Sequence, residues 1–124
     1  MSSLTYGMTH LAINVRDVGK TLQFYQHVFG MEVMYHEAKM IQLTTPGNHD
    51  VIVFEEKDGT VGQAGGIAHF GFRLKESGHI TQILARLKDV NAEIVDEGEF
   101  VPGSPYVFFK DPDGYVVEVW YELV

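Results

Sequence analysis

Apolar positions recur with a period of two over residues 7–15. The apolar set is Leu11, Ile13 and Val15, and the residues between them are His10, Ala12 and Asn14. Such alternation is typical of a half-buried β-strand, because successive side chains point to opposite faces. We therefore expect a strand here, with its large apolar residues on the core and His10 on the other face.

The pattern then changes to helical spacing. Asp17 can cap a helix, and Gly30 suits the position just after its end. The residues at helical spacing are Thr21, Leu22, Phe24, Tyr25, Val28 and Phe29. Three further strands are predicted over 31–35, 40–44 and 51–55, with a turn at residues 46–48. The first half of the chain is thus β-α-β-β-β.

The second half repeats this order after a glycine-rich connection over residues 56–66. A strand is predicted over 67–74, and a helix capped by Ser77 is predicted to run to about residue 90. The last three strands are predicted over 92–95, 106–109 and 115–122. The sequence Asp-Pro-Asp-Gly at 111–114 predicts a tight turn between the last two.

The two halves can be superimposed as an internal repeat. His10 takes the position of His69, and residues 51–53 take the positions of residues 116–118. An internal repeat is strong evidence of architecture. We expect an α+β fold in a single domain, 1–124, with two paired βαβββ modules (about 5–56 and 66–124). The modules are expected to form a curved mixed sheet around a metal and substrate cleft.

Composition narrows the classes of partner. The 124 residues carry 9 basic and 17 acidic side chains, a formal net charge of −8, and no cysteine. Without clustered Lys and Arg, nucleic acid and anionic membranes are not expected partners. Without cysteine, thiolate catalysis and thiolate metal ligation are excluded. Neither a signal peptide nor a membrane-spanning run is evident, so a cytoplasmic location is expected by default.

Three residues form a candidate metal site. His10 and His69 occupy the same repeat position, on the strand face opposite the core. Glu118 alternates with Val117 and Val119, and so falls on the corresponding face of the last strand. A single strand histidine is more often structural or on the surface. Two repeat-related imidazoles and one carboxylate, however, match a facial metal triad with open positions opposite.

The chain resembles the vicinal oxygen chelate superfamily, which contains glyoxalase I, fosfomycin-resistance enzymes, methylmalonyl-CoA epimerase, extradiol dioxygenases and bleomycin-resistance proteins. The segments that carry the resemblance are residues 8–17, 24–33, 68–72 and 109–118. Its most specific part is the Asp-Pro-Asp-Gly turn that leads to Glu118.

The resemblance implies several properties. His10, His69 and Glu118 match the positions of the family's metal ligands, for one divalent ion per site (Fe, Mn, Ni, Zn or Co). A homodimer that acts on a small-molecule substrate is also implied. In many members each site takes ligands from both subunits.

Departures from the family pattern bear on the reaction. Glyoxalase I has a fourth ligand, a Glu, where the repeat places Val53. Ordinary glyoxalase I activity is therefore doubtful, unless a bulge lets Glu55 take that place. Extradiol dioxygenases carry an acid-base His, absent from residues 99–102, and a Tyr where Phe108 stands; Tyr106 could substitute. Fosfomycin-resistance enzymes continue into a phosphonate clamp that residues 120–124 do not resemble.

Four residues are candidates for substrate binding. Arg73 lies four positions beyond His69 and could bind a carboxylate or phosphate, although it could equally be an exposed strand-end charge. Trp120, Phe108 and Tyr35 could line a pocket, although strand aromatics are more often core residues.

Three functional hypotheses stay open. The first is a metal-dependent lyase, isomerase or dioxygenase-like enzyme. The second is a protein of the bleomycin-resistance type that binds and sequesters a drug or aromatic compound. The third is an interaction domain that uses the fold alone.

Overall fold

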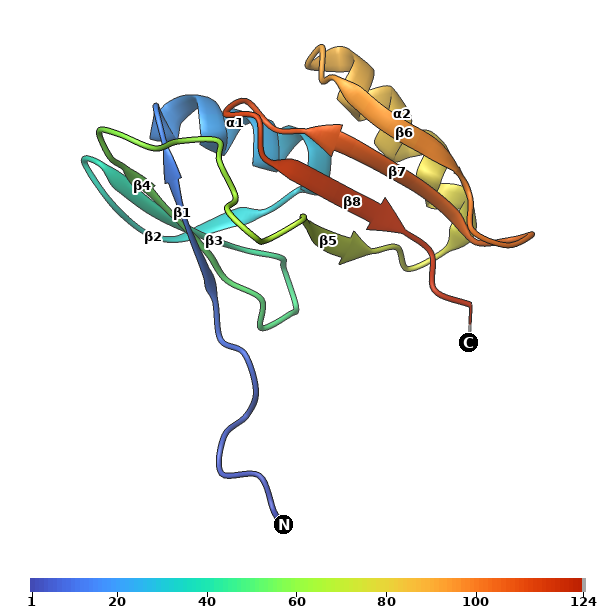
Figure 1. Cartoon of the computed structure of the whole chain (residues 1–124), viewed down its shortest axis with the longest axis horizontal. Coiled ribbons are helices and arrows are strands. Elements are labelled where there is room, and N and C mark those ends of the chain that lie inside the picture. The colour runs from blue at the N-terminus through green and yellow to red at the C-terminus, as the bar shows by residue number, and fades with distance from the viewer. Residues whose placement is uncertain (124) are drawn as a thin grey trace. The chain divides into compact units, whose positions relative to one another are not determined.

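The computed structural model describes residues 1–123 (Figure 1). Val124, the last residue of the predicted second module, lies outside the described residues. The chain divides into two compact units, Met1–Gly59 and Thr60–Val124. The division falls in the predicted glycine-rich connection, and we describe each unit by itself.

Unit 1 has the element order β-α-β-β-β. Its elements are β1 (Leu11–Val15), α1 (Val18–Phe29), β2 (Glu32–Glu37), β3 (Met40–Thr44) and β4 (Ile52–Glu56). The sheet order is β1-β4-β3-β2, in which β1 and β4 are parallel and the other pairs are antiparallel. Helix α1 packs against β3 and β4, so one face of the sheet is covered and the other is open.

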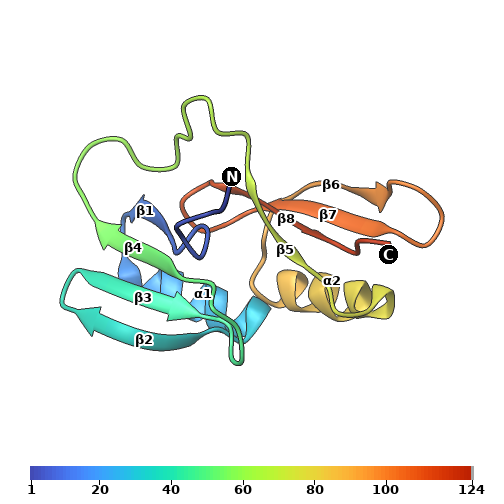
Figure 2. The same ribbon diagram turned by 90° about the horizontal axis from the view of Figure 1, so that it is seen from below.

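Unit 2 repeats this order. Its elements are β5 (Phe70–Arg73), the 3₁₀ turn η1 (Ser77–His79), α2 (Ile80–Asp89), β6 (Ile94–Glu99), β7 (Pro105–Lys110) and β8 (Val116–Trp120). The sheet order is β5-β8-β7-β6, with β5 and β8 parallel. Figure 2 shows each helix beside the sheet of its own unit. The α+β fold with two βαβββ modules is confirmed. Neither described helix is long and apolar enough to cross a membrane.

Each unit has its own core between helix and sheet. The fully buried hydrophobic side chains are Val15, Tyr25, Val28, Leu43 and Phe54 in unit 1, and Leu87, Val107, Phe109, Val117 and Val119 in unit 2. Burial of such a side chain contributes roughly 1.5–3 kcal/mol each. In the strands these residues alternate with partly exposed ones, as the period of two predicts.

The strand registers establish the repeat residue by residue. Four positions lie side by side across each sheet, one on each strand. In unit 1 this row is Ala12, Val53, Gln42 and Tyr35, and in unit 2 it is Gly71, Glu118, Phe108 and Asp96. One edge strand of each sheet, β2 or β6, also carries a register shift just before its row position, at Val33/Tyr35 and Ile94/Asp96.

The predicted limits of α1 are confirmed. The Asp17 carboxylate accepts hydrogen bonds from the backbone N–H groups of Gly19 and Lys20, at 2.8 and 3.2 Å. Gly30 follows the helix in the left-handed conformation, with φ 66°, where a side chain would be strained.

The predicted cap at Ser77 is wrong. Ser77 begins η1, and the residues that precede η1 and α2, Glu76 and His79, make no side-chain cap hydrogen bond. Helix α2 instead continues from a 3₁₀ turn, a common start for a helix. The sequence could not distinguish a capping serine from one inside such a turn.

Several predicted strand limits are also corrected. β1 and β5 begin at Leu11 and Phe70, the first residues that pair with their parallel partners, at Ile52 of β4 and Val117 of β8. Both histidines therefore directly precede a strand. β6 begins at Ile94, since the N–H of Ala92 still bonds back to the carbonyl of Leu87 at the end of α2.

The two helix starts give a matched test. We expect Asp17→Ala to lower the free energy of unfolding by about 1 kcal/mol, because two helix N–H groups lose their acceptor. Ser77→Ala should change it by less than about 0.5 kcal/mol. Urea denaturation followed by circular dichroism measures both, and equal effects of the two substitutions would contradict the cap assignment.

Candidate metal centre

Two of the three predicted ligands come together in unit 2. The Nε2 atom of His69 lies 3.6 Å from the Oε1 atom of Glu118. The side chain of Glu118 is 14% exposed and that of His69 is 36% exposed. The pair is thus close to the surface of the sheet and open to a ligand on one side.

Packing on the opposite face of the sheet orients Glu118. Its neighbours on β8, Val117 and Val119, are fully buried. Because side chains alternate along a strand, Glu118 must project from the open face. The same parity places Gly71 of β5 and Phe108 of β7 on either side of it.

Gly71 leaves the space that the carboxylate uses. A Cβ atom built on Gly71 would lie 3.3 Å from Oε1 of Glu118 and 3.2 Å from its backbone oxygen. Both distances are tighter than ordinary contact. The carboxylate therefore leans over β5, toward His69, and the absence of a side chain at Gly71 makes this possible.

Phe108 packs against the imidazole. The two rings meet edge to face, with centroids 5.0 Å apart and an interplanar angle of 87°. Such a contact is worth about 0.5–1.5 kcal/mol and limits the orientations of the His69 side chain. Phe108, predicted to line a pocket, thus supports a candidate ligand directly.

The pair has the dimensions of a half-formed metal site. Imidazole nitrogen and carboxylate oxygen bind divalent ions at about 2.0–2.2 Å, so two donors on one tetrahedral ion lie roughly 3.4 Å apart. The observed 3.6 Å separation differs from this by a few tenths of an ångström. Neutral imidazole with carboxylate is also a donor set that zinc, manganese and iron(II) accept.

His10 belongs to unit 1. It is exposed and lies two residues before Ala12, just as His69 lies two residues before Gly71. Within neither unit of the described chain do three His, Asp or Glu side chains form a group that could hold a metal ion. The role of His10 as a third ligand therefore stays a prediction.

The register places Val53 at the position equivalent to Glu118. Val53 pairs with Ala12 and Gln42, as Glu118 pairs with Gly71 and Phe108. Strand β4 keeps its register with both neighbours, so no bulge moves Glu55 into this position. Glu55 instead forms an ion pair with Lys57, at 3.5 Å.

The remaining predicted site residues lie in different surroundings. Arg73 is exposed, and its Nε atom forms an ion pair with Glu122 at 3.2 Å. Tyr35 lies in unit 1 and donates a hydrogen bond of 2.7 Å to Glu37, whose carboxylate raises the pKa of the phenol. Trp120 lies on β8 two residues beyond Glu118, and so on the same face.

An aromatic cluster beside the pair was not predicted as a unit. Phe100 and Tyr106 join Trp120 and Phe108 on this face, with Phe100 stacked on Tyr106 at 4.1 Å. The Tyr106 hydroxyl donates a hydrogen bond of 3.0 Å to Asp96, and this bond raises the pKa of the phenol. Tyr106 therefore stays a neutral donor at physiological pH. The sequence pattern alone could not reveal the cluster, because it depends on the strand register that places Tyr106 opposite Trp120.

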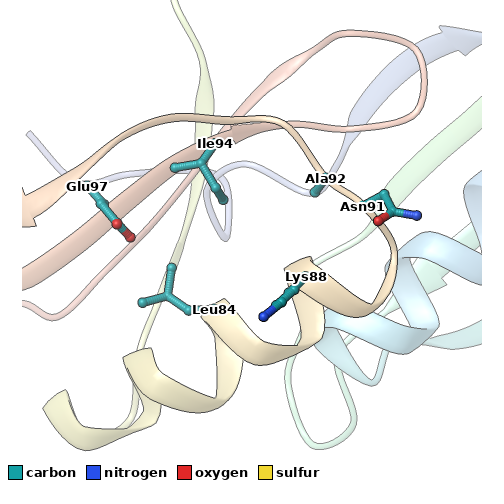
Figure 3. A pocket seen from close by; sticks show the side chains of 6 residues that line it. All are labelled: Leu84, Lys88, Asn91, Ala92, Ile94 and Glu97. Carbon is teal, nitrogen blue, oxygen red and sulfur yellow. The ribbon is translucent and has the colours of Figure 1, made fainter.

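A concave feature of unit 2 lies away from this pair. It is an open groove between α2 and β6 with a volume of about 520 Å³ (Figure 3). Leu84, Ala92 and Ile94 supply apolar lining, while Lys88 and Glu97 bring opposite charges. No candidate metal ligand lines it.

Comparisons with known proteins identify relatives of this fold. Residues 7–119 match the family model described as the Glyoxalase/Bleomycin resistance protein/Dioxygenase superfamily. The catechol-2,3-dioxygenase of Bacillus subtilis is 27% identical over 90% of this chain, which spans only 41% of that protein. The metallothiol transferase FosB of Shouchella clausii is 24% identical over 91% of this chain and 78% of that protein.

A solved structure agrees with the whole fold. The fosfomycin resistance protein FosX of Listeria monocytogenes superimposes with a TM-score of 0.82 and 24% identity, over 98% of this chain and 97% of that one. A variant of the same protein, solved with Mn(II) and 1S,2S-dihydroxypropylphosphonic acid, superimposes with a TM-score of 0.78 and 25% identity, over 94% of this chain and 90% of that one. The family model covers nearly the whole chain, and this protein therefore belongs to the glyoxalase/bleomycin resistance protein/dioxygenase superfamily.

Proposed function

We propose that this protein is a metal-dependent enzyme that acts on a small substrate through two neighbouring oxygens. In this proposal His10, His69 and Glu118 hold one divalent ion. The observation that carries the proposal is the His69–Glu118 pair, two donors of the right kind at 3.6 Å on an open sheet face. The proposal includes a His10 from the same chain and, equally, a His10 from a second copy.

Two features of the relatives support a metal cofactor. The Listeria protein of similar fold was solved with Mn(II), and the FosB relative is described as a metallothiol transferase. The compound in that Listeria structure carries hydroxyl groups on neighbouring carbons. A site that binds a metal and two neighbouring oxygens is thus consistent with this fold.

The chemistry of the proposed site follows from its open side. A divalent ion with free positions polarises a bound oxygen and stabilises negative charge that develops on it. Glu118 and His69 would hold the ion, and Phe108 keeps the imidazole directed toward it. Because Val53 supplies no fourth donor, we propose a reaction other than that of ordinary glyoxalase I.

The proposal includes an assembly and a location. We infer a homodimer, as the family resemblance implies, and we propose that it acts in the cytoplasm. The partner is a small molecule, neither nucleic acid nor a membrane, since the net charge of −8 opposes binding to polyanions.

The alternative is a protein that binds and sequesters a drug or aromatic compound, as in the bleomycin-resistance type. The aromatic cluster on the open face favours it, because Phe100 is 50% exposed and available to a ligand. This alternative predicts ligand binding that survives loss of both unit 2 donors.

Metal binding tests the enzyme proposal. We expect the purified protein to bind about one Mn(II) per chain, measured by titration calorimetry and by the EPR signal of free Mn(II). Changing a proposed ligand, in His69→Ala or Glu118→Ala, should weaken binding at least a hundredfold, because each removes one donor. His10→Ala should also weaken it if His10 completes the site.

His79→Ala is the matched control, since His79 is also partly exposed and close to a carboxylate, that of Glu76 at 3.8 Å. It should bind Mn(II) like the unchanged protein. Equal affinity in His69→Ala and His79→Ala would refute the assignment of His69 as a ligand.

The position of Val53 gives a gain-of-function test. Val53 lies on the open face at the position equivalent to Glu118, so Val53→Glu should add a carboxylate donor beside His10. We expect Ni(II) affinity to rise about tenfold or more, measured by calorimetry. Val53→Gln is the control for size. An unchanged affinity in Val53→Glu would place this row of unit 1 away from the metal.

A further inference from the structure

We propose that the open face of unit 2 selects an uncharged aromatic ring as the substrate or ligand class of the site. The ring would lie against an aromatic ridge, which we define as Phe100, Tyr106, Phe108 and Trp120. The inference deepens the proposed function, and only the chelation of ring oxygens rests on it.

The ridge is continuous with the candidate metal ligands. His69 contacts Phe108 at 5.0 Å, and Phe108 contacts Tyr106 at 5.6 Å. Tyr106 stacks on Phe100 at 4.1 Å, and Phe100 meets Trp120 edge to face at 6.2 Å. A chain of ring contacts thus leads from the imidazole to the far end of β8.

The central ring of the ridge is held in place on three sides. Asp96 accepts the Tyr106 hydroxyl at 3.0 Å, and Phe100 covers one face of the ring. Gly98 lies beneath, where a Cβ atom would be 3.2 Å from the Tyr106 hydroxyl. Tyr106 is therefore a fixed support for the half-exposed Phe100 ring, and a preorganised ring of this kind lowers the entropic cost of binding a flat ligand.

The ridge remains accessible although its residues are large and apolar. Phe100 is 50% exposed, and Tyr106, Phe108 and Trp120 are each partly exposed. The buried aromatic residue of this sheet, Phe109, points to the opposite face and is fully covered. Among the aromatic side chains of β7, Phe109 thus packs in the core, whereas Tyr106 and Phe108 lie on the open surface.

Charge on this face argues against an anionic substrate. The strands β5 to β8 contain two cationic residues, Arg73 and Lys110. Arg73 pairs with Glu122 at 3.2 Å and Lys110 pairs with Glu93 at 3.3 Å. Asp96 and Glu118 add negative charge beside the ridge. A phosphonate or phosphate would find ion-paired cations here, whereas an uncharged ring meets rings on which it can stack.

Trp120 is the only tryptophan of the chain and so reports directly on this surface. We would titrate the full chain with 2,3-dihydroxynaphthalene, a flat ring with neighbouring oxygens, and follow Trp120 fluorescence and binding heat. Binding should weaken about fivefold or more in Phe100→Ala and in Phe100→Leu, which removes the ring but keeps most of the apolar volume. Val101→Ala, at a neighbouring residue of similar exposure (51%), is the control and should bind within twofold of the unchanged protein.

Propylphosphonate tests the charge argument and should bind at least tenfold more weakly than the naphthalene diol. Equal binding of the two compounds, or unchanged diol binding in both Phe100 variants, would overturn the inference.

A second diol separates this inference from the proposed function. In chelator-treated protein, 2,3- and 2,7-dihydroxynaphthalene should bind alike, since only the ring is recognised. With Mn(II), only the 2,3 isomer should bind more tightly. If Mn(II) has no effect but the Phe100 variants still lose ring binding, the metal proposal fails and this inference stands. If Mn(II) tightens binding while the Phe100 variants bind normally, the inference fails and the metal proposal stands.

Discussion

The candidate site depends on one constraint, the burial of Val117 and Val119 in the core between the sheet and helix of unit 2. Each of these side chains is fully buried, and a shift of one residue would expose both and bury Glu118. Burial of a carboxylate among apolar side chains is far more costly than its exposure on the open face. The core of unit 2 therefore determines the direction in which Glu118 projects, before any ligand is considered.

The repeat shows which parts of this arrangement are architecture and which are chemistry. Both units share the strand order, a histidine just before the first strand and a register shift in one edge strand, β2 or β6. The two cross-strand rows differ at the candidate ligand position. Unit 2 has Gly71 beside Glu118, whereas unit 1 has Ala12 beside Val53. Only unit 2 combines a carboxylate with the space that lets it approach an imidazole. The same βαβββ fold thus presents different side chains on the open faces of its two copies.

The sequence predicted features that depend on local rules. Asp17 and Gly30 mark the ends of α1 by backbone chemistry that involves few neighbours, and the alternation around Glu118 gives its face directly. Features that depend on neighbouring strands were missed or misplaced. β1 and β5 were predicted to include His10 and His69. Each strand instead begins one residue later, where its parallel partner strand offers hydrogen bonds.

Gly71 and Phe100 show the same limit at the site. Gly71 matters because of what lies on the next strand, and a glycine in a strand looks the same in sequence whatever it faces. Phe100 follows β6 in a loop, and it gains its role only through its stack on Tyr106. Cross-strand contacts of this kind require the register, which periodicity alone does not provide.

Strand β7 connects the candidate metal ligands to the aromatic ridge on the open face. Phe108 touches His69 at 5.0 Å and Tyr106 at 5.6 Å, so the ring that supports a candidate ligand is also part of the aromatic ridge. A ligand stacked on the ridge would therefore lie next to the open side of the His69–Glu118 pair. The ridge itself needs no metal for its geometry, because its rings are held by one another, by Asp96 and by the sheet. Stacking of a ring on the ridge and binding of an ion by the His69–Glu118 pair would therefore be separable properties of this face.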